Sequence, residues 1–246
     1  MSKREKKSDP KDIQEFYDKL MADDDHYEVK SQLHGWAGNF HRYRIKLLRN
    51  IFLNDLNTTK NTKILDIGCG PCIFSEIFSK DEYPKVTGFD ISTINIKKAQ
   101  KNNPHFNFTV DNAQNPKIRG EWDVIFAGEI IEHLPQPIKA LEKWSKLLKS
   151  DGYIILSTPN GIFNKKTEEH ISLFKLNEMK KVLNENYQII KVLGIDLYIP
   201  LLNLLLNRFI MNKFPKISDR LFQFKMKLPL KSPILANNII YIAKKK

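Results

Sequence analysis

The sequence predicts an α/β fold in which helices cover both faces of a mostly parallel β-sheet. From residue 63 onward, short apolar runs typical of buried strands alternate with longer amphipathic stretches. Such alternation is typical of parallel strands joined by crossover helices. The chain has 246 residues, of which 41% are hydrophobic, so one large domain can bury a sizeable core. The same composition excludes collagen-like, disulfide-rich and wholly disordered proteins.

Each predicted element corresponds to a run in the sequence. Strands are expected at Lys63–Ile67, Val86–Phe89, Phe106–Val110, Trp122–Ala127, Tyr153–Ser157, Gln188–Leu193 and Ile239–Ala243. Helical spacing of apolar residues is found over Ile13–Leu53, from Ile73–Phe78, and over Ile94–Gln100, Pro137–Leu148 and Leu176–Leu183. Ser92 precedes one of these helices and is a favoured N-cap residue.

The formal net charge of +12 is concentrated at one end of the chain. Residues 207–246 hold ten basic side chains and one acidic side chain, whereas residues 1–206 together carry only +3. A uniformly basic nucleic-acid-binding domain would not show this distribution. The pattern indicates a neutral core with one basic appendage.

The appendage overlaps a long segment between the last two predicted strands, residues 196–236. This segment is too long for a hairpin loop, and it combines the apolar run Tyr198–Leu206 with seven lysines and arginines. We expect a functional insertion. Residues 197–231 would contact an anionic membrane peripherally, or cover an apolar substrate, or form an ordinary lid helix whose basic face is solvated.

The location of the protein is predicted from what the sequence lacks. The N-terminal residues MSKREKKSDPKD have no apolar run of a secretory signal, and no 18-residue apolar stretch predicts a spanning helix. Two cysteines are too few for a disulfide framework. We therefore expect a cytoplasmic protein, peripheral to the membrane if the insertion contacts lipid. No sequence feature fixes its oligomeric state.

A glycine-rich turn follows the first predicted strand. Gly68 and Gly70 lie at the end of that strand and before a helix, where glycines let the backbone approach a ligand closely. Asp90 follows Gly70 by 20 residues and ends the second strand, where a carboxylate can accept hydrogen bonds from both ribose hydroxyls. The spacing predicts a site for a nucleoside cofactor.

The same turn contains a Cys-x-x-Cys sequence, Cys69 to Cys72, which is also found in thiol oxidoreductases. A redox site would account for both cysteines but would leave Asp66 and Asp90 without a role. We keep the thiol oxidoreductase as a remote alternative, and interpret the cysteines as small residues of a cofactor turn.

Five motifs in the same order resemble class I S-adenosylmethionine-dependent methyltransferases, in particular the ubiquinone-biosynthesis O-methyltransferase group. These are ILDIGCGP (64–71), Asp90, Asp111-Asn112-Ala113, WDVIFAGEIIEHL (122–134) and LLKSDGYIILSTPN (147–160), extended by EHISLFKLNEMKKVL (169–183). The resemblance covers residues 60–195 and the final strand. It implies a Rossmann-like seven-stranded sheet whose last strand is antiparallel, with S-adenosylmethionine as the cofactor.

The resemblance also implies a domain division. Residues 1–12 would be a disordered basic tail, 13–60 an N-terminal helical lid, and 61–246 the methyltransferase domain with its insertion at 196–236.

By the same resemblance, each motif holds one part of the cofactor. Asp66 would orient the amino end of the methionine moiety, Asp90 the ribose and Asp111 the adenine amino group. Arg44, or its neighbour Arg42, would pair with the cofactor carboxylate. The implied cofactor-binding set is Arg44, Asp66, Gly68, Gly70, Asp90, Ile91, Asp111, Asn112, Ala113 and Glu129. Cys72 departs from the pattern, because many relatives have a third glycine there.

The candidate catalytic residues lie in Glu129-Ile130-Ile131-Glu132-His133. If residues 129–134 begin a helical turn, Glu129, Glu132 and His133 share one face. His133, assisted by Glu132, would be the base that deprotonates a hydroxyl acceptor. Alternatively, all three would hold Mg²⁺, or His133 would only shape the cofactor pocket. His170 is a further residue that could face the acceptor.

We expect O-methylation of a small acceptor, such as a lipophilic, lipid-linked or sugar-linked molecule. An RNA 2′-O-methyltransferase is the alternative, although the sequence shows no aromatic and basic recognition module for RNA. A non-catalytic subunit is the third interpretation, and the intact cofactor motifs argue against it.

Overall fold

The structure, a computed structural model, describes residues 10–22, 35–167, 169–197, 213–227 and 232–246. Its strands are β1 (Lys63–Ile67), β2 (Lys85–Asp90), β3 (Asn107–Val110), β4 (Trp122–Gly128), β5 (Leu148–Pro159), β6 (Tyr187–Leu197) and β7 (Ala236–Lys245). The longer helices are α1 (Pro10–Ala22), α2 (Gly35–Asn50), α4 (Thr93–Asn102), α5 (Pro137–Ser145), α6 (Leu176–Asn186) and α9 (Pro215–Lys227). The shorter ones are η4 (Ile51–Asp55), α3 (Phe74–Ile77), η5 (Lys80–Glu82), η6 (Ile131–His133) and η7 (Pro233–Leu235).

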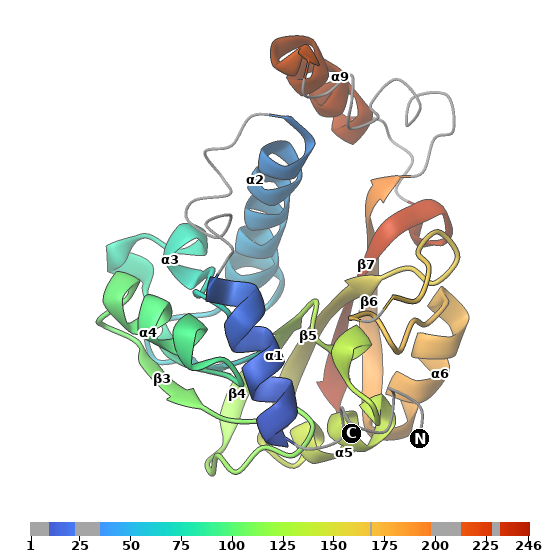
Figure 1. Cartoon of the computed structure of the whole chain (residues 1–246). Helices are drawn as coiled ribbons and strands as arrows, with labels where there is room; N and C mark the ends of the chain where they lie inside the picture. The colour runs from blue at the N-terminus through green and yellow to red at the C-terminus, as the bar shows by residue number, and fades with distance from the viewer. Residues whose placement is uncertain (1–9, 23–34, 168, 198–212, 228–231) are drawn as a thin grey trace.

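All seven strands form one sheet in the order β3-β2-β1-β4-β5-β7-β6 (Figure 1). The pairs from β3 to β5 are parallel, and β7 runs antiparallel to both β5 and β6. The predicted fold class is therefore confirmed. The chain changes direction across the sheet between β1 and β4, and the carboxyl ends of these strands form the edge at which α/β proteins bind ligands.

Alternating side chains of the strands build two cores, one on each face. Leu65, Ile125 and Ile154 belong to the core beneath α5 and α6, whereas their neighbours Ile64 and Val124 belong to the core beneath α2 and α3. Since parallel strands are buried on both faces, they appear in the sequence as continuous apolar runs. Helices on both faces are thus a consequence of the runs that predicted the strands.

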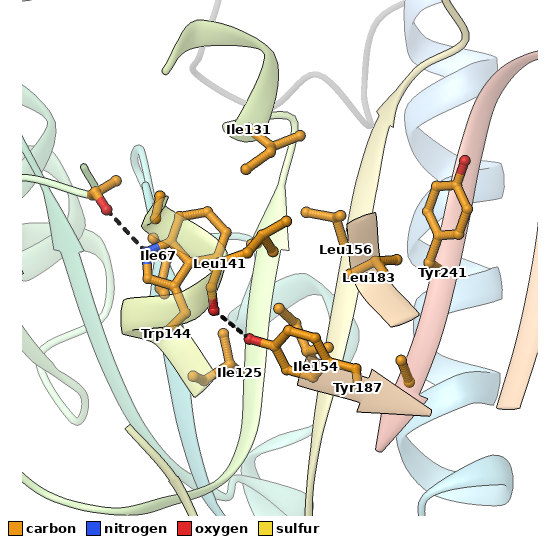
Figure 2. Close-up of a cluster of buried hydrophobic side chains, with 14 of the residues drawn as sticks. Ile67, Ile125, Ile131, Leu141, Trp144, Ile154, Leu156, Leu183, Tyr187 and Tyr241 are labelled. Atoms are coloured by element: carbon orange, nitrogen blue, oxygen red, sulfur yellow. Dashed lines mark hydrogen bonds between the residues drawn. The ribbon is translucent and has the colours of Figure 1, made fainter. Parts of the chain in front are cut away.

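Two buried hydrogen bonds attach α5 to neighbouring parts of the chain (Figure 2). Trp144 of α5 donates its indole N–H to the Ala113 carbonyl at 2.9 Å. Tyr187, at the start of β6, donates its hydroxyl to the Leu141 carbonyl at 2.8 Å. Both side chains are fully buried, so each hydrogen bond satisfies a polar atom that would otherwise be costly to bury.

Several predicted boundaries are shifted. α1 begins at Pro10, three residues before the predicted lid, and residues 1–9 of the predicted tail lie outside the described residues. α5 ends at Ser145 because the chain from Leu148 already pairs with Trp122 in the sheet. β6 extends to Leu197 and β7 starts at Ala236, so both ends of the predicted insertion are strand. The predicted apolar run 198–206 lies outside the described residues.

None of the helices in the described ranges is long and apolar enough to cross a membrane.

Candidate functional site

A cavity of about 1090 Å³ lies at the carboxyl ends of the central strands. Its wall includes the turn after β1, the ends of β2 and β4, the loop after β3, and residues of α1 and α2. All ten residues predicted to bind the cofactor line this cavity, and so does His133. Sequence positions from 44 to 133 therefore converge on one site.

The turn after β1 has the open backbone that its glycines predict. Gly68 and Gly70 have φ angles of +67° and +52°, a region that favours glycine. A Cβ atom at Gly68 would lie 2.7 Å from Ile130, whereas a Cβ atom at Gly70 would meet nothing within 4 Å. Gly68 is thus required by packing, and Gly70 faces open space in the cavity.

Asp90 fixes this turn from the end of β2. One carboxylate oxygen accepts the Gly70 N–H at 3.0 Å, and the other accepts the Ser92 N–H at 2.8 Å. The Asn95 side chain donates a third hydrogen bond to this carboxylate, so one of its four lone-pair sites remains for a ligand. Burial raises the pKa of Asp90, while these three hydrogen bonds oppose this. A ligand donor such as a hydroxyl would stabilise the charged form further.

Asp111 holds the shape of the loop after β3. Its carboxylate oxygens accept the N–H groups of Asn112 at 2.8 Å, Lys117 at 2.8 Å and Ile118 at 2.9 Å. Three of its four lone-pair sites are therefore occupied within the protein. Trp144 fixes the same loop from below through the Ala113 carbonyl. The loop is thus positioned before any ligand binds.

Three ionisable side chains meet in the wall: Asp66, which is buried, and Arg44 and Glu129, which are half-buried. Burial, aided by Asp90, raises the pKa of Asp66 well above its usual value, and the positive charge of Arg44 opposes this. Burial also raises the pKa of Glu129, again opposed by Arg44. Arg44 Nε and Asp66 Oδ2 are buried without a hydrogen-bond partner. One unpaired donor and one unpaired acceptor match the carboxylate and the ammonium of an amino-acid moiety, so the residues fit the methionine end of S-adenosylmethionine.

The two arginine candidates are separated by the structure. Arg44 lines the cavity, whereas Arg42 donates to the Asn39 side chain at 3.0 Å. His41, on the same helix, also lines the cavity, and its Nε2 lies 3.1 Å from a Glu76 carboxylate oxygen. The side chain of Trp36, on the same helix, lies outside the described residues.

The predicted helical face of Glu129, Glu132 and His133 is wrong. Only Ile131–His133 forms a turn of 3₁₀ helix, and Glu129 lies outside it with a φ angle of +55°. The Glu129 carboxylate instead accepts the Ser157 hydroxyl at 2.7 Å. The i, i+3, i+4 relation does not apply, because the chain leaves β4 through a left-handed residue before it turns.

Glu132 is fully buried and is not among the described residues that line the cavity. One of its carboxylate oxygens accepts the Thr158 hydroxyl at 3.3 Å and the other has no partner. Burial and the neighbouring Glu129 raise the pKa of Glu132 well above its usual value. Glu132 can therefore act on an acceptor only through its neighbours, which corrects its prediction as a catalytic residue.

His133 has a defined tautomer. Its Nδ1 lies 3.0 Å from the Glu169 carbonyl, and since a carbonyl only accepts, Nδ1 carries the proton and Nε2 is free. Burial and the nearby His170 lower the pKa of His133 to about 4. The ring is therefore neutral near pH 7, with an unprotonated nitrogen available.

Two aromatic side chains flank His133. The ring centre of His170 lies 4.9 Å away and that of Tyr17, on α1, lies 6.1 Å away, both edge to face. The sequence suggested only that His170 could face the acceptor, and no pattern in it indicated that Tyr17 approaches His133. Their approach to His133 depends on loops that the sequence pattern does not place.

The possible metal ligands differ from the predicted set. Among the described residues, Glu132, His133 and His170 have ligand atoms within 4.8 Å of one another. Two imidazoles and one carboxylate do not match the oxygen ligands that Mg²⁺ prefers, so the donor chemistry does not support the Mg²⁺ prediction.

The thiol oxidoreductase alternative is not supported. Cys69 and Cys72 are free and buried, and burial raises the pKa of both thiols. Redox-active motifs require a lowered thiol pKa, because the thiolate is the reactive form.

Helix α1 covers one side of the cavity. Ile13, Tyr17 and Met21 line it from this helix. The Asp18 carboxylate accepts the hydroxyls of Ser92 at 2.7 Å and Thr93 at 3.0 Å, which attaches α1 to the N-terminus of α4. A carboxylate is favoured there by the helix dipole. The sequence did not reveal this contact, because it joins residues 74 positions apart.

Comparison with known proteins agrees with this site. A family model described as a methyltransferase domain matches residues 36–192. The ubiquinone biosynthesis O-methyltransferase of Actinobacillus pleuropneumoniae serotype 7 is 31% identical over 139 residues, which are 51% of this chain and 59% of that protein. The enzyme of the same name from Hydrogenovibrio crunogenus is 32% identical over 126 residues, 48% of this chain and 51% of that protein. The match thus spans less than two thirds of these relatives.

Solved structures share the fold at low sequence identity. The N-methyltransferase NodS from Bradyrhizobium japonicum WM9, in complex with S-adenosyl-L-homocysteine, has a TM-score of 0.64 and 13% identity, covering 94% of this chain and 97% of NodS. The [4+2]-cyclase SpnF has a TM-score of 0.63 and 12% identity, covering 96% of both chains. These likenesses concern the fold alone. With more than half of its length matched by the methyltransferase family model, the chain belongs to the class I S-adenosylmethionine-dependent methyltransferases.

Proposed function

We propose that the protein transfers the methyl group of S-adenosylmethionine to an oxygen atom of a small lipophilic acceptor. The observation that carries this proposal is His133, a neutral histidine with a fixed tautomer and a free Nε2 at the cavity wall. A hydroxyl acceptor must lose a proton as its oxygen attacks a methyl group, and a neutral imidazole can take that proton. The O-methyltransferase names of the relatives support the same reaction.

The cofactor supplies, when bound, a methyl group on a positively charged sulfur. Asp66 and Arg44 would bind the amino and carboxylate ends of its methionine moiety, and Asp90 would bind the ribose hydroxyls. Asp66, Asp90, Asp111 and Glu129 give the wall more carboxyl groups than cations, which suits a positively charged ligand. These residues mainly position the reactants, which is the largest requirement of an in-line displacement.

His133 would accept the acceptor hydroxyl proton at Nε2 while a carbon–oxygen bond forms and the carbon–sulfur bond breaks. The Glu169 carbonyl holds Nδ1–H and so keeps Nε2 in the accepting form. Because the pKa of His133 is about 4, the imidazolium formed would return its proton to solvent readily after turnover.

Apolar residues of the cavity support a lipophilic acceptor. Ile13, Tyr17, Met21 and Leu134 lie on the same wall as His133. A cavity of about 1090 Å³ is at the upper end of the range of small-molecule sites, so it has room for an acceptor beside the cofactor. A phenolic quinone precursor with an apolar chain fits this wall.

The test is methyl transfer to a panel of acceptors, with His133→Ala compared with His105→Ala. His105 is an exposed histidine that is stacked on Tyr83 and does not line the cavity, so it controls for the loss of an imidazole. Loss of a general base typically lowers kcat by about 10² to 10⁴-fold. We expect such a loss for His133→Ala at saturating cofactor, with an unchanged cofactor Kd, and full activity for His105→Ala. Unchanged kcat in His133→Ala, or methylation of RNA but of no phenolic acceptor, would contradict the proposal.

A further inference from the structure

Helix α9 presents large apolar side chains to solvent. Ile217 and Phe224 lie seven residues apart on one face of α9 and are 56% and 59% exposed. Phe214, just before the helix, is 48% exposed. The face turned inward carries Phe222 and Lys225, which are buried. Figure 1 shows α9 at the periphery, beyond the end of α2.

The orientation of α9 is fixed by polar contacts on its inner face. Lys225 Nζ lies 2.5 Å from an Asp196 carboxylate oxygen, with both side chains 2% exposed. Asn237 donates to the other oxygen of Asp196 at 2.7 Å. At the opposite end, the Asp219 carboxylate accepts the Asn39 side chain of α2 at 2.5 Å. The helix cannot rotate to bury Ile217 and Phe224 without breaking these contacts.

The outward face is also cationic. Lys216 and Arg220 are exposed one turn apart beside Ile217 and Phe224. The one acidic residue of α9 is Asp219, which is bonded to Asn39. A helix that combines exposed apolar side chains with basic ones, and presents no free carboxylate, has the composition of a helix that lies on an anionic membrane.

We propose that α9, with Phe214, docks the protein on the surface of an anionic phospholipid bilayer. Ile217, Phe224 and Phe214 would enter the boundary between head groups and acyl chains, and Lys216 and Arg220 would contact lipid phosphates. A protein partner fits less well, because lysine is depleted at the centre of protein interfaces.

Docking would bring the cavity close to the lipid. Asn39, which holds α9, lies two residues from His41 and five from Arg44 on α2, and both of these line the cavity. At 1.5 Å per residue, Asn39, where α2 contacts α9, lies about 8 Å along the axis of α2 from Arg44 in the cavity wall. The docking itself does not depend on methyl transfer or on the identity of the acceptor.

The experiment is flotation of the full chain with vesicles of phosphatidylcholine alone or with added phosphatidylglycerol. The protein should float only with the anionic vesicles, and high salt should weaken binding. Each cation near an anionic surface strengthens binding by about five-fold. Lys216→Glu with Arg220→Glu should therefore weaken binding by at least about twentyfold, and Ile217→Asp with Phe224→Asp should abolish it.

Matched changes elsewhere on the surface are the controls. Ile138→Asp and Lys139→Glu alter an exposed pair of the same residue types on α5, and these variants should bind like the unchanged protein. Cofactor Kd should be the same in every variant, which shows that each is folded and separates this test from that of the proposed function. Equal binding to both vesicle types, or equal loss in the α5 variants, would overturn the proposal. Binding to RNA without binding to vesicles would overturn it as well.

Discussion

The buried ion pair beneath α9 gives the sharpest prediction of stability. Replacing Lys225 by Met removes the cation at 2.5 Å from Asp196. It leaves a carboxylate that is 2% exposed and that accepts a hydrogen bond from Asn237 at 2.7 Å. Breaking a buried pair from one side typically costs about 3–5 kcal/mol, because the remaining charge is neither paired nor hydrated. Lys225→Met should therefore lower the free energy of unfolding by about 3–5 kcal/mol, or release α9 locally.

Two matched variants isolate the effect of the charge. Lys216→Met makes the same substitution at an exposed site of α9 and should change stability by less than about 0.5 kcal/mol. Asp196→Asn combined with Lys225→Met removes both charges, and asparagine tolerates the φ angle of +58° found at Asp196. The double variant should recover most of the loss, because no buried charge remains unpaired.

Urea unfolding followed by far-ultraviolet circular dichroism measures the global loss, and limited trypsin digestion measures release of α9. If the free energy of local opening of α9 falls by about 3 kcal/mol, trypsin should cleave α9 about a hundredfold faster, since 1.4 kcal/mol corresponds to a factor of ten. A single variant that loses less than about 1 kcal/mol and keeps its protease resistance would refute this reasoning. So would a double variant less stable than the single one.

Three further predictions concern the cavity. Trp144→Phe leaves the Ala113 carbonyl without its 2.9 Å donor, so it should lower the free energy of unfolding by about 1–3 kcal/mol and also weaken cofactor binding. Tyr187→Phe should lower stability without changing cofactor binding. Equal cofactor Kd values for the two variants in a calorimetric titration would contradict this. Asp18→Ala should speed cofactor dissociation by about tenfold, because α1 loses its attachment to α4. Asp12→Ala, at an exposed site on the same helix, should leave the dissociation rate unchanged, and stopped-flow measurement of cofactor release tests both variants. Because the pKa of His133 is lowered from 6.5 to about 4, the unfolded chain binds the proton more tightly, and the ligand-free protein should lose about 2 kcal/mol of stability as the pH falls from about 7 to about 5. His133→Asn should remove this part of the pH dependence in urea titrations, and an unchanged dependence would show that another group causes it.

The variant His170→Ala separates two roles of His170, one as a group that shifts the pKa of His133 and one as a metal ligand. His170 lowers the pKa of His133, and both could bind the same ion with Glu132. Where His170 only tunes its neighbour, His170→Ala leaves a working enzyme whose acidic limb moves to higher pH. Where it is a metal ligand, the same change removes activity at every pH.

The sequence by itself determined the sheet and the wall of the cavity. All seven strands could be predicted because each contains a short apolar run, and the runs are clearest in the central parallel strands, which are buried on both faces. Gly68, Gly70 and Asp90 could be predicted because they follow directly from the ends of those strands, whereas Asp111 was predicted from the resemblance to the methyltransferases. Local backbone preferences suffice for these features.

The tertiary structure decided how the side chains near the acceptor meet. The left-handed backbone of Glu129 separates it from Glu132 and His133, although their spacing suggested one helical face. His133 receives its tautomer from a carbonyl 36 residues away, and α9 is oriented by a pair 29 residues apart. Such contacts depend on where loops and helices return in space, and no local periodicity encodes that. The family and the fold are therefore readable from short-range pattern, whereas the tautomer of His133, the attachment of α1 to α4 and the outward face of α9 arise only when distant segments pack together.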